Sequence, residues 1–181
     1  MSVKNGDGPM AENILQGKRM LAVDDEPDVL DVLSEDLDRH GVKLDTALSY
    51  EIGIQLLTSF TYDLVILDIM GVRGFELLQF AASRNMPVVM LTAHALSPDA
   101  LKKSIELGAR AYLPKDDLDR IAPFLEDVLT LSYESTWKKI LPRLARLFGK
   151  RFGPEWRQSE KEFWDQFEKD LEMKSATIIE S

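Results

Sequence analysis

Short apolar runs alternate with amphipathic segments along most of this chain. The apolar runs at residues 19–23, 42–47, 64–67, 88–91 and 111–113 have the length and composition of β-strands. Between them, apolar residues at helical spacing predict helices at residues 27–40, 50–59, 75–83 and 98–107, the last ended by Gly108. Strands that are joined by helical crossovers pair in parallel, so the pattern predicts an α/β fold with helices on both faces of one sheet.

The two central runs, residues 64–67 and 88–91, lack polar alternation. Strands of this kind are buried on both faces, as in the middle of a parallel sheet. The fold class we predict is therefore a doubly wound, five-stranded parallel sheet that is followed by an α-helical extension.

Residue composition and periodicity divide the chain into three parts. Residues 1–17 are rich in Gly, Asn and Ser without periodicity, which predicts a mobile N-terminal arm. Residues 18–134 hold the alternating pattern, and residues 135–181 are a helical extension in which aromatic residues are concentrated. Pro142 predicts a kink or a fresh helix start, and Gly153-Pro154 predicts a stop between two helices, so a helical hairpin is the simplest arrangement.

Composition limits the function classes. The 181 residues are 45% hydrophobic and 29% charged, as in soluble globular proteins. No apolar stretch is long enough for a transmembrane segment or resembles a secretory signal, so we expect a cytoplasmic protein. The absence of cysteine excludes disulfides, thiolate zinc sites and cysteine nucleophiles, and a net charge of −9 makes nucleic acid an unfavourable partner for the chain as a whole.

Chemically competent side chains follow four of the predicted strands. Asp24 and Asp25 follow the first strand, Asp68 the third, Thr92 the fourth and Lys115 the fifth. In a doubly wound sheet these ends form the ligand site, so the five side chains should converge. Clustered carboxylates favour a hard divalent cation, for which Mg²⁺ is the natural choice. The set suits phosphoryl transfer, in which Asp68 attacks, Thr92 donates a hydrogen bond and Lys115 forms an ion pair.

Each of these residues also has an ordinary structural interpretation. Asp24 and Asp25 could cap the helix that begins at Pro27, and Asp68 could be a turn residue. Thr92 is of a type that is common at strand ends. The functional interpretation therefore depends on the joint occurrence of all five.

The segments LAVDDEP, LVILDIM, VVMLTAH and GARAYLPK resemble the signature segments of response regulator receiver domains, over about residues 18–123. The resemblance implies a flavodoxin-like receiver fold. It also implies that Asp24, Asp25, Asp68 and the backbone carbonyl of Met70 bind Mg²⁺. Asp68 would accept a phosphoryl group from a sensor histidine kinase or a phosphotransfer protein.

The same resemblance assigns Thr92 and Tyr112 to a conformational switch, with output near the fourth helix and the fifth strand. Positions Met70 and His94 would tune the lifetime of the phosphate. By this resemblance the protein is a phosphoacceptor with self-phosphorylation and self-dephosphorylation only, and it is not otherwise an enzyme. Its signal would pass to a downstream protein target or through a homodimer.

Two positions depart from the family pattern. Gly71 stands near the place where the family has proline, which predicts a looser loop. The family has a cis proline directly after the lysine, whereas here Pro114 precedes Lys115 and Asp116 follows it. A cis bond without proline costs about 3–4 kcal/mol, so either that cost is met elsewhere or the loop is reshaped.

The extension is basic at its start. Residues 136–153 contain no acid and six cations, at Lys138, Lys139, Arg143, Arg146, Lys150 and Arg151. We expect their helix to form a hairpin with the final helix, within the chain or swapped in a dimer. The alternative is a DNA-binding transcriptional response regulator that uses this basic helix. The short tail and its aromatic density argue against that alternative, and binding of nucleic acid is accordingly not expected.

Overall fold

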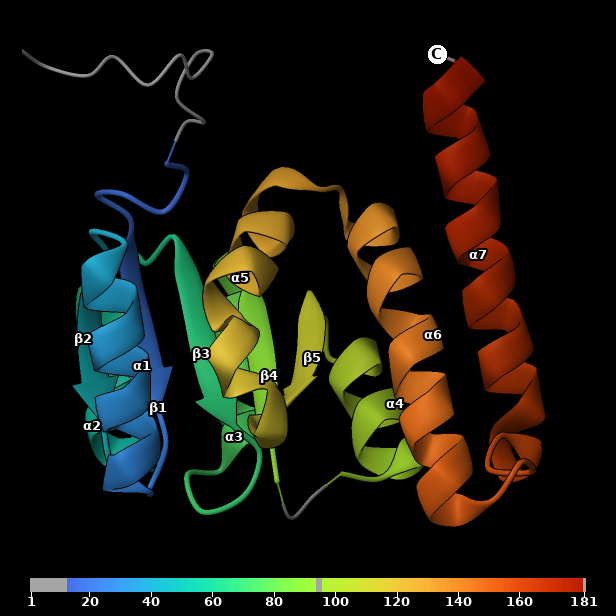
Figure 1. The fold of residues 1–181 in the computed structure, drawn as a ribbon, viewed down its shortest axis with the longest axis horizontal. Helices are drawn as coiled ribbons and strands as arrows, with labels where there is room; N and C mark the ends of the chain where they lie inside the picture. The colour runs from blue at the N-terminus through green and yellow to red at the C-terminus, as the bar shows by residue number, and fades with distance from the viewer. Residues whose placement is uncertain (1–12, 94–95, 181) are drawn as a thin grey trace, which may run out of the picture.

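The structure is a computed structural model that describes residues 13–93 and 96–180 (Figure 1). Its centre is a five-stranded parallel sheet in the order β2-β1-β3-β4-β5. The strands are β1 (Arg19–Val23), β2 (Lys43–Ala47), β3 (Leu64–Asp68), β4 (Val88–Thr92) and β5 (Ala111–Pro114). The predicted doubly wound α/β fold is confirmed, and each predicted strand differs from the observed one by at most a residue at either end.

Helices cover both faces of the sheet. The helices of this domain are α1 (Pro27–Arg39), α2 (Tyr50–Ser59), α3 (Gly74–Ser83), α4 (Pro98–Glu106) and α5 (Ile121–Thr130), with a short 3₁₀ helix, η1 (Lys115–Arg120), after β5. Buried residues of α1 and α5 join one apolar cluster, and those of α2, α3 and α4 join the other. In β3, Leu64 and Ile66 belong to the first cluster and Val65 and Leu67 to the second, which explains why this strand has no polar position.

The segment before β1 is attached to the core. Leu15 is fully buried in the cluster that α1 and α5 line, and the amide of Gly17 donates a hydrogen bond to the carbonyl of Gly41 at 2.9 Å. The mobile arm predicted for residues 1–17 is therefore wrong for residues 13–17, while residues 1–12 lie outside the described part of the chain. A single leucine gives no periodicity, so the sequence pattern did not reveal this contact.

We expect the substitution Leu15→Ala to lower the free energy of unfolding by about 2 kcal/mol, the lower end of the range for a buried leucine, because the segment before β1 can shift to fill part of the space. Urea unfolding measures this change. The matched control is Leu48→Ala, since the Leu48 side chain is 51% exposed. Equal effects of the two substitutions would show that Leu15 contributes nothing to the core.

The extension forms two further helices, α6 (Tyr133–Phe152) and α7 (Lys161–Glu180), linked through the 3₁₀ turn η2 (Gln158–Glu160). Figure 1 shows them side by side at the end of the sheet next to β5 and α4. The rings of Trp137 and Phe167 meet edge to face, with 5.8 Å between their centroids. Helix α6 ends before Gly153, as predicted, but it runs through Pro142, so the predicted fresh helix start there is wrong.

Apolar side chains in the first part of α7 are buried. Trp164, Phe167 and Leu171 are buried, whereas Phe163 is only partly so. We refer to α6, α7 and the segment that links them as the hairpin. Among the helices of the described residues, none has the length and hydropathy that a bilayer crossing needs.

Candidate functional site

Three carboxylates meet at the carboxyl edge of the sheet. Asp24 directly follows β1, and Asp68 ends β3, the strand that pairs beside it. One oxygen from each of Asp24, Asp25 and Asp68 lies within 4.8 Å of the others. Asp24 and Asp68 are buried and Asp25 is exposed, so the cluster opens to solvent on one side. Such a set of hard oxygen donors fits a divalent cation of the Mg²⁺ type.

Lys115, the residue after β5, reaches into this cluster. Its Nζ lies 2.8 Å from Oδ2 of Asp24 and 3.1 Å from Oδ1 of Asp68. It also lies 2.9 Å from Oε2 of Glu26, a partner that the sequence interpretation missed although Glu26 directly follows the acidic pair. The ammonium therefore offsets part of the charge of two buried carboxylates.

Burial shifts the acid–base properties of the cluster. Burial, and next the charge of Asp24, raise the pKa of Asp68 to about 6, against the opposing effect of Lys115. Burial likewise raises the pKa of Asp24. Burial alone would lower the pKa of Lys115, but the hydrogen bonds to Asp24 and Glu26 and the charge of Asp68 outweigh it, and the pKa is raised. Lys115 thus remains charged at neutral pH, and the excess negative charge lies on the carboxylates.

Two glycines shape the loop after β3. Gly71 has a φ of +84°, and a Cβ there would lie 2.2 Å from Oδ2 of Asp25. A Cβ on Gly74 would lie 2.0 Å from the carbonyl oxygen of Asp68. Proline cannot adopt a positive φ, so Gly71 is required by this backbone. Val72 within the loop is fully buried, so the loop is attached to the core at this residue.

Thr92 and Tyr112 lie beside each other. Thr92 ends β4, Tyr112 lies in the adjacent strand β5, and both side chains are buried. A hydrogen bond links the Tyr112 hydroxyl to the Thr92 side chain, and burial raises the pKa of Tyr112. Met70 follows the cluster on the loop, with its side chain 59% exposed. His94 lies outside the described residues.

The loop after Lys115 is reshaped. No peptide bond of the described residues is cis, and the chain turns directly into the 3₁₀ helix η1. Asp117 in this helix pairs with Arg143 of α6, with 2.7 Å between the Asp117 Oδ1 and an Arg143 guanidinium nitrogen. The loop that carries Lys115 is therefore connected to the hairpin.

Comparison with known proteins agrees with this geometry. The response regulator receiver domain family matches residues 20–125, which is more than half of the chain. This chain belongs to the response regulator receiver family. The match ends within α5, before the hairpin begins.

Relatives of the receiver occur within longer proteins. The chain is 32% identical over 141 residues to the transcriptional regulatory protein GlrR of Escherichia coli, covering 71% of this chain and 31% of GlrR. It is 32% identical over 119 residues to the transcriptional regulatory protein TcrA of Mycobacterium tuberculosis, covering 63% of this chain and 47% of TcrA. The chain thus spans half or less of the length of these two relatives.

Solved structures match the receiver alone. The response regulator TrrA of Thermotoga maritima, in complex with Mg²⁺–BeF, is 32% identical with a TM-score of 0.54, covering 62% of this chain and 99% of TrrA. The receiver domain of NtrX from Brucella abortus is 30% identical with a TM-score of 0.56 and the same coverages. Both agree with the fold described above.

Proposed function

We propose that this response regulator accepts a phosphoryl group on Asp68 and passes the signal on through a protein contact that involves the hairpin. The observation that carries the proposal is the convergence of Asp24, Asp25, Asp68 and Lys115 at one edge of the sheet. The donor is a sensor histidine kinase or a phosphotransfer protein. The protein acts as a phosphoacceptor with self-catalysed gain and loss of phosphate, and it needs no further enzymatic site.

The carboxylate cluster fits Mg²⁺ because it offers hard oxygen donors from three side chains within 4.8 Å. Asp25, Asp68 and the Met70 carbonyl would hold the ion, with Asp24 acting mainly through water. When bound, the ion supplies positive charge that offsets the charge of an incoming phosphoryl group. The related TrrA structure, solved as a Mg²⁺–BeF complex, supports this assignment.

Each side chain of the site has a separate role in the phosphoryl transfer. An Asp68 oxygen attacks phosphorus, the bond to the donor nitrogen breaks, and an acyl phosphate forms. Lys115 pairs with the new negative charge, and the Thr92 hydroxyl donates a hydrogen bond to a phosphoryl oxygen. The Tyr112 hydroxyl shares a hydrogen bond with the Thr92 side chain. When the Thr92 hydroxyl moves toward the phosphate, that hydrogen bond is lost and the Tyr112 ring is less restrained.

The hairpin is in a position to receive this change. Trp137 of α6 donates a hydrogen bond from Nε1 to the carbonyl of Ala109, just before β5, at 3.3 Å. Lys102 of α4 pairs with Glu160 at 2.8 Å, and Arg143 pairs with Asp117 of η1. The expected output region around α4 and β5 is thus covered by the hairpin, and we propose that phosphorylation changes this contact in favour of a downstream protein or a second copy of the chain.

DNA binding is the second candidate, because GlrR and TcrA are named as transcriptional regulators. The contacts of α6 favour the protein contact instead. Three of its six cations are already paired within the chain: Lys138 with Glu172, Lys139 with Asp127 and Arg143 with Asp117. A steep loss of duplex affinity with rising salt, relieved by Arg146→Ala and Lys150→Ala, would instead favour DNA binding.

The test is intact mass and light scattering after size exclusion, with Mg²⁺ and acetyl phosphate. Wild type should gain one phosphoryl group and Asp68→Ala none, because Asp68 is the carboxylate to which we assign the role of acceptor. Asp119→Ala, at an exposed aspartate of η1, is the matched control and should be modified like wild type. Failure of wild type to gain the group, from acetyl phosphate or a phosphorylated kinase, would overturn the proposal.

A further inference from the structure

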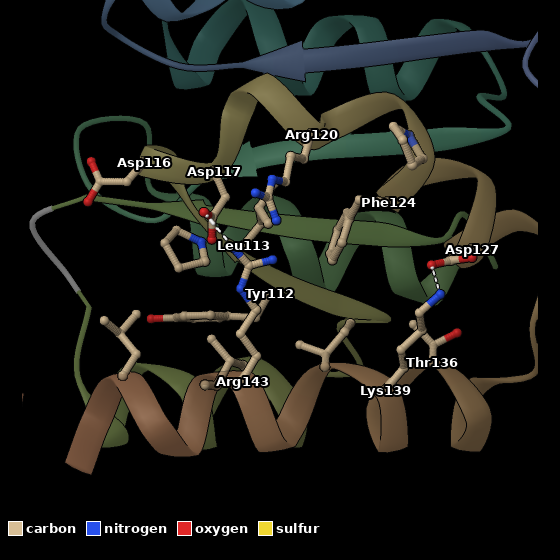
Figure 2. A pocket seen from close by; sticks show the side chains of 15 residues that line it. Tyr112, Leu113, Asp116, Asp117, Arg120, Phe124, Asp127, Thr136, Lys139 and Arg143 are labelled. Carbon is tan, nitrogen blue, oxygen red and sulfur yellow. Dashed lines mark hydrogen bonds and ion pairs between the residues drawn. The ribbon is translucent and has the colours of Figure 1, made fainter. Parts of the chain in front are cut away.

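A cavity of about 420 Å³ lies between the receiver and α6, away from the carboxylate cluster (Figure 2). One wall comes from β5, η1 and α5, and the other comes from one side of α6. Its volume falls in the range of small-molecule sites, about 300–1,000 Å³. The two walls are far apart in the sequence, so the cavity exists only because the hairpin packs on the receiver.

The interior of the cavity is apolar and partly aromatic. The rings of Tyr112 and Phe124 both belong to the receiver wall, and the Tyr112 ring lies directly above α6 (Figure 2). Ile140 and Leu144 of α6 close the lower side. These side chains offer rings and aliphatic groups for contact with a flat apolar ligand.

One cation that lines the cavity is in no ion pair among the described residues. Asp117 pairs with Arg143 at 2.7 Å, and Asp127 pairs with Lys139 at 2.6 Å. Arg120 points toward the centre of the cavity in Figure 2, and no ion pair joins it to another of the described residues. Asp116 also lines the cavity, and its carboxylate points away from the centre in the same view. Each of the two ion pairs is neutral, so the guanidinium of Arg120 is the cation of the lining that remains unpaired within the described residues.

We infer that this cavity binds a small aromatic carboxylate, whose ring system rests between Tyr112, Phe124 and Ile140 and whose carboxylate pairs with Arg120. The planar guanidinium matches a carboxylate in charge and in geometry. The inference concerns the unphosphorylated protein and can be tested apart from the proposed function, because neither the carboxylate cluster nor Lys115 lines the cavity.

The experiment is an NMR titration of the full chain with naphthoate and with two analogues of similar size, neutral naphthylmethanol and cationic naphthylmethylammonium. Naphthoate should bind at about millimolar concentration and shift amide signals of β5, α5 and α6. It should bind about fivefold more tightly than naphthylmethanol, the discrimination that one exposed charge pair supplies.

Variants of the chain separate the charge effect from general apolar binding. Arg120→Ala should bring the naphthoate and naphthylmethanol affinities together, and Arg120→Glu should make naphthylmethylammonium the preferred ligand. Arg146→Ala, an exposed arginine of the same hairpin that does not line the cavity, should behave like wild type. The inference is overturned if wild type shows no saturable shifts, if naphthoate and naphthylmethanol bind it equally, or if Arg120→Ala leaves the preference intact.

Discussion

Replacing Asp68 with asparagine should stabilise the metal-free protein at pH 7.5 by up to about 3 kcal/mol, while wild type and Asp68→Asn should be nearly equal at pH 4. Burial and the charge of Asp24 raise the pKa of Asp68 to about 6, roughly two units above its value of 3.8 in an unfolded chain. The folded protein therefore binds a proton more tightly than the unfolded chain does. Stability contributed by that proton is complete below about pH 4 and is lost as the pH rises through 6.

Asparagine imitates the protonated carboxyl group, so the stability of Asp68→Asn should not fall as the pH rises through 6. The substitution leaves Lys115 paired, because Asp24 and Glu26 remain 2.8 and 2.9 Å from its Nζ. Urea unfolding with a chelator, between pH 4 and 7.5, measures the difference. Asp119→Asn should stay within about 0.5 kcal/mol of wild type at every pH, as is usual for a surface substitution. A pH-independent difference between wild type and Asp68→Asn would contradict the raised pKa.

Added Mg²⁺ should act in the opposite direction. A cation that binds the folded protein alone stabilises it by mass action, and Asp68 is one of the three carboxylates that would bind the ion. Wild type should therefore gain stability from Mg²⁺ at pH 7.5, and Asp68→Asn should gain much less. The raised pKa of Asp68 and its proposed role with Mg²⁺ have one origin, which is negative charge held in a buried position.

Most of the receiver fold could be predicted because its signals are local. A strand such as β3, apolar at every position before Asp68, has no plausible place except between two layers of helices. The strand ends then determine which side chains converge, since the carboxyl ends of parallel strands share one edge of the sheet. The sequence therefore predicted that Asp24, Asp68 and Lys115 lie close together, as they do in the structure.

The features that were missed depend on contacts between distant segments. Leu15 is buried by α1 and α5, and nothing in its own neighbourhood indicates this. Pro142 lies inside one continuous α6 although it lacks an amide donor, and the burial of Leu141 and Leu144 in the core offsets that cost. Helix α6 was expected to pack on the final helix, yet its residues Lys139 and Arg143 pair with the receiver. The spacing of apolar and charged residues predicts which faces of a helix are apolar and which are charged. It does not predict which neighbouring element packs against each face.

Trp137→Ala should lower the free energy of unfolding by about 3–5 kcal/mol, the largest effect that we expect from any single truncation in the hairpin. The Trp137 side chain is fully buried, and its ring meets those of Tyr133 and Phe167 edge to face at 6.4 and 5.8 Å. Its Nε1 also donates the hydrogen bond to Ala109. One side chain thus joins α6, α7 and the segment before β5, and alanine would leave a large cavity between them.

Hydrogen exchange should show which elements lose stability in Trp137→Ala. In Trp137→Ala the amides of α6 and α7 should lose protection while those of β1, β3 and β4 keep most of theirs, since the receiver has its own core around α1 and α5. Trp156→Ala is the matched control, because that ring contacts Phe148 and Trp164 within the hairpin, at 5.2 Å from each. It should weaken the hairpin without releasing α6 from the receiver. Uniform loss of protection across sheet and hairpin in Trp137→Ala would instead mean that the two unfold as one unit. A hairpin that cannot detach from the receiver without unfolding it could not transmit a signal by detaching.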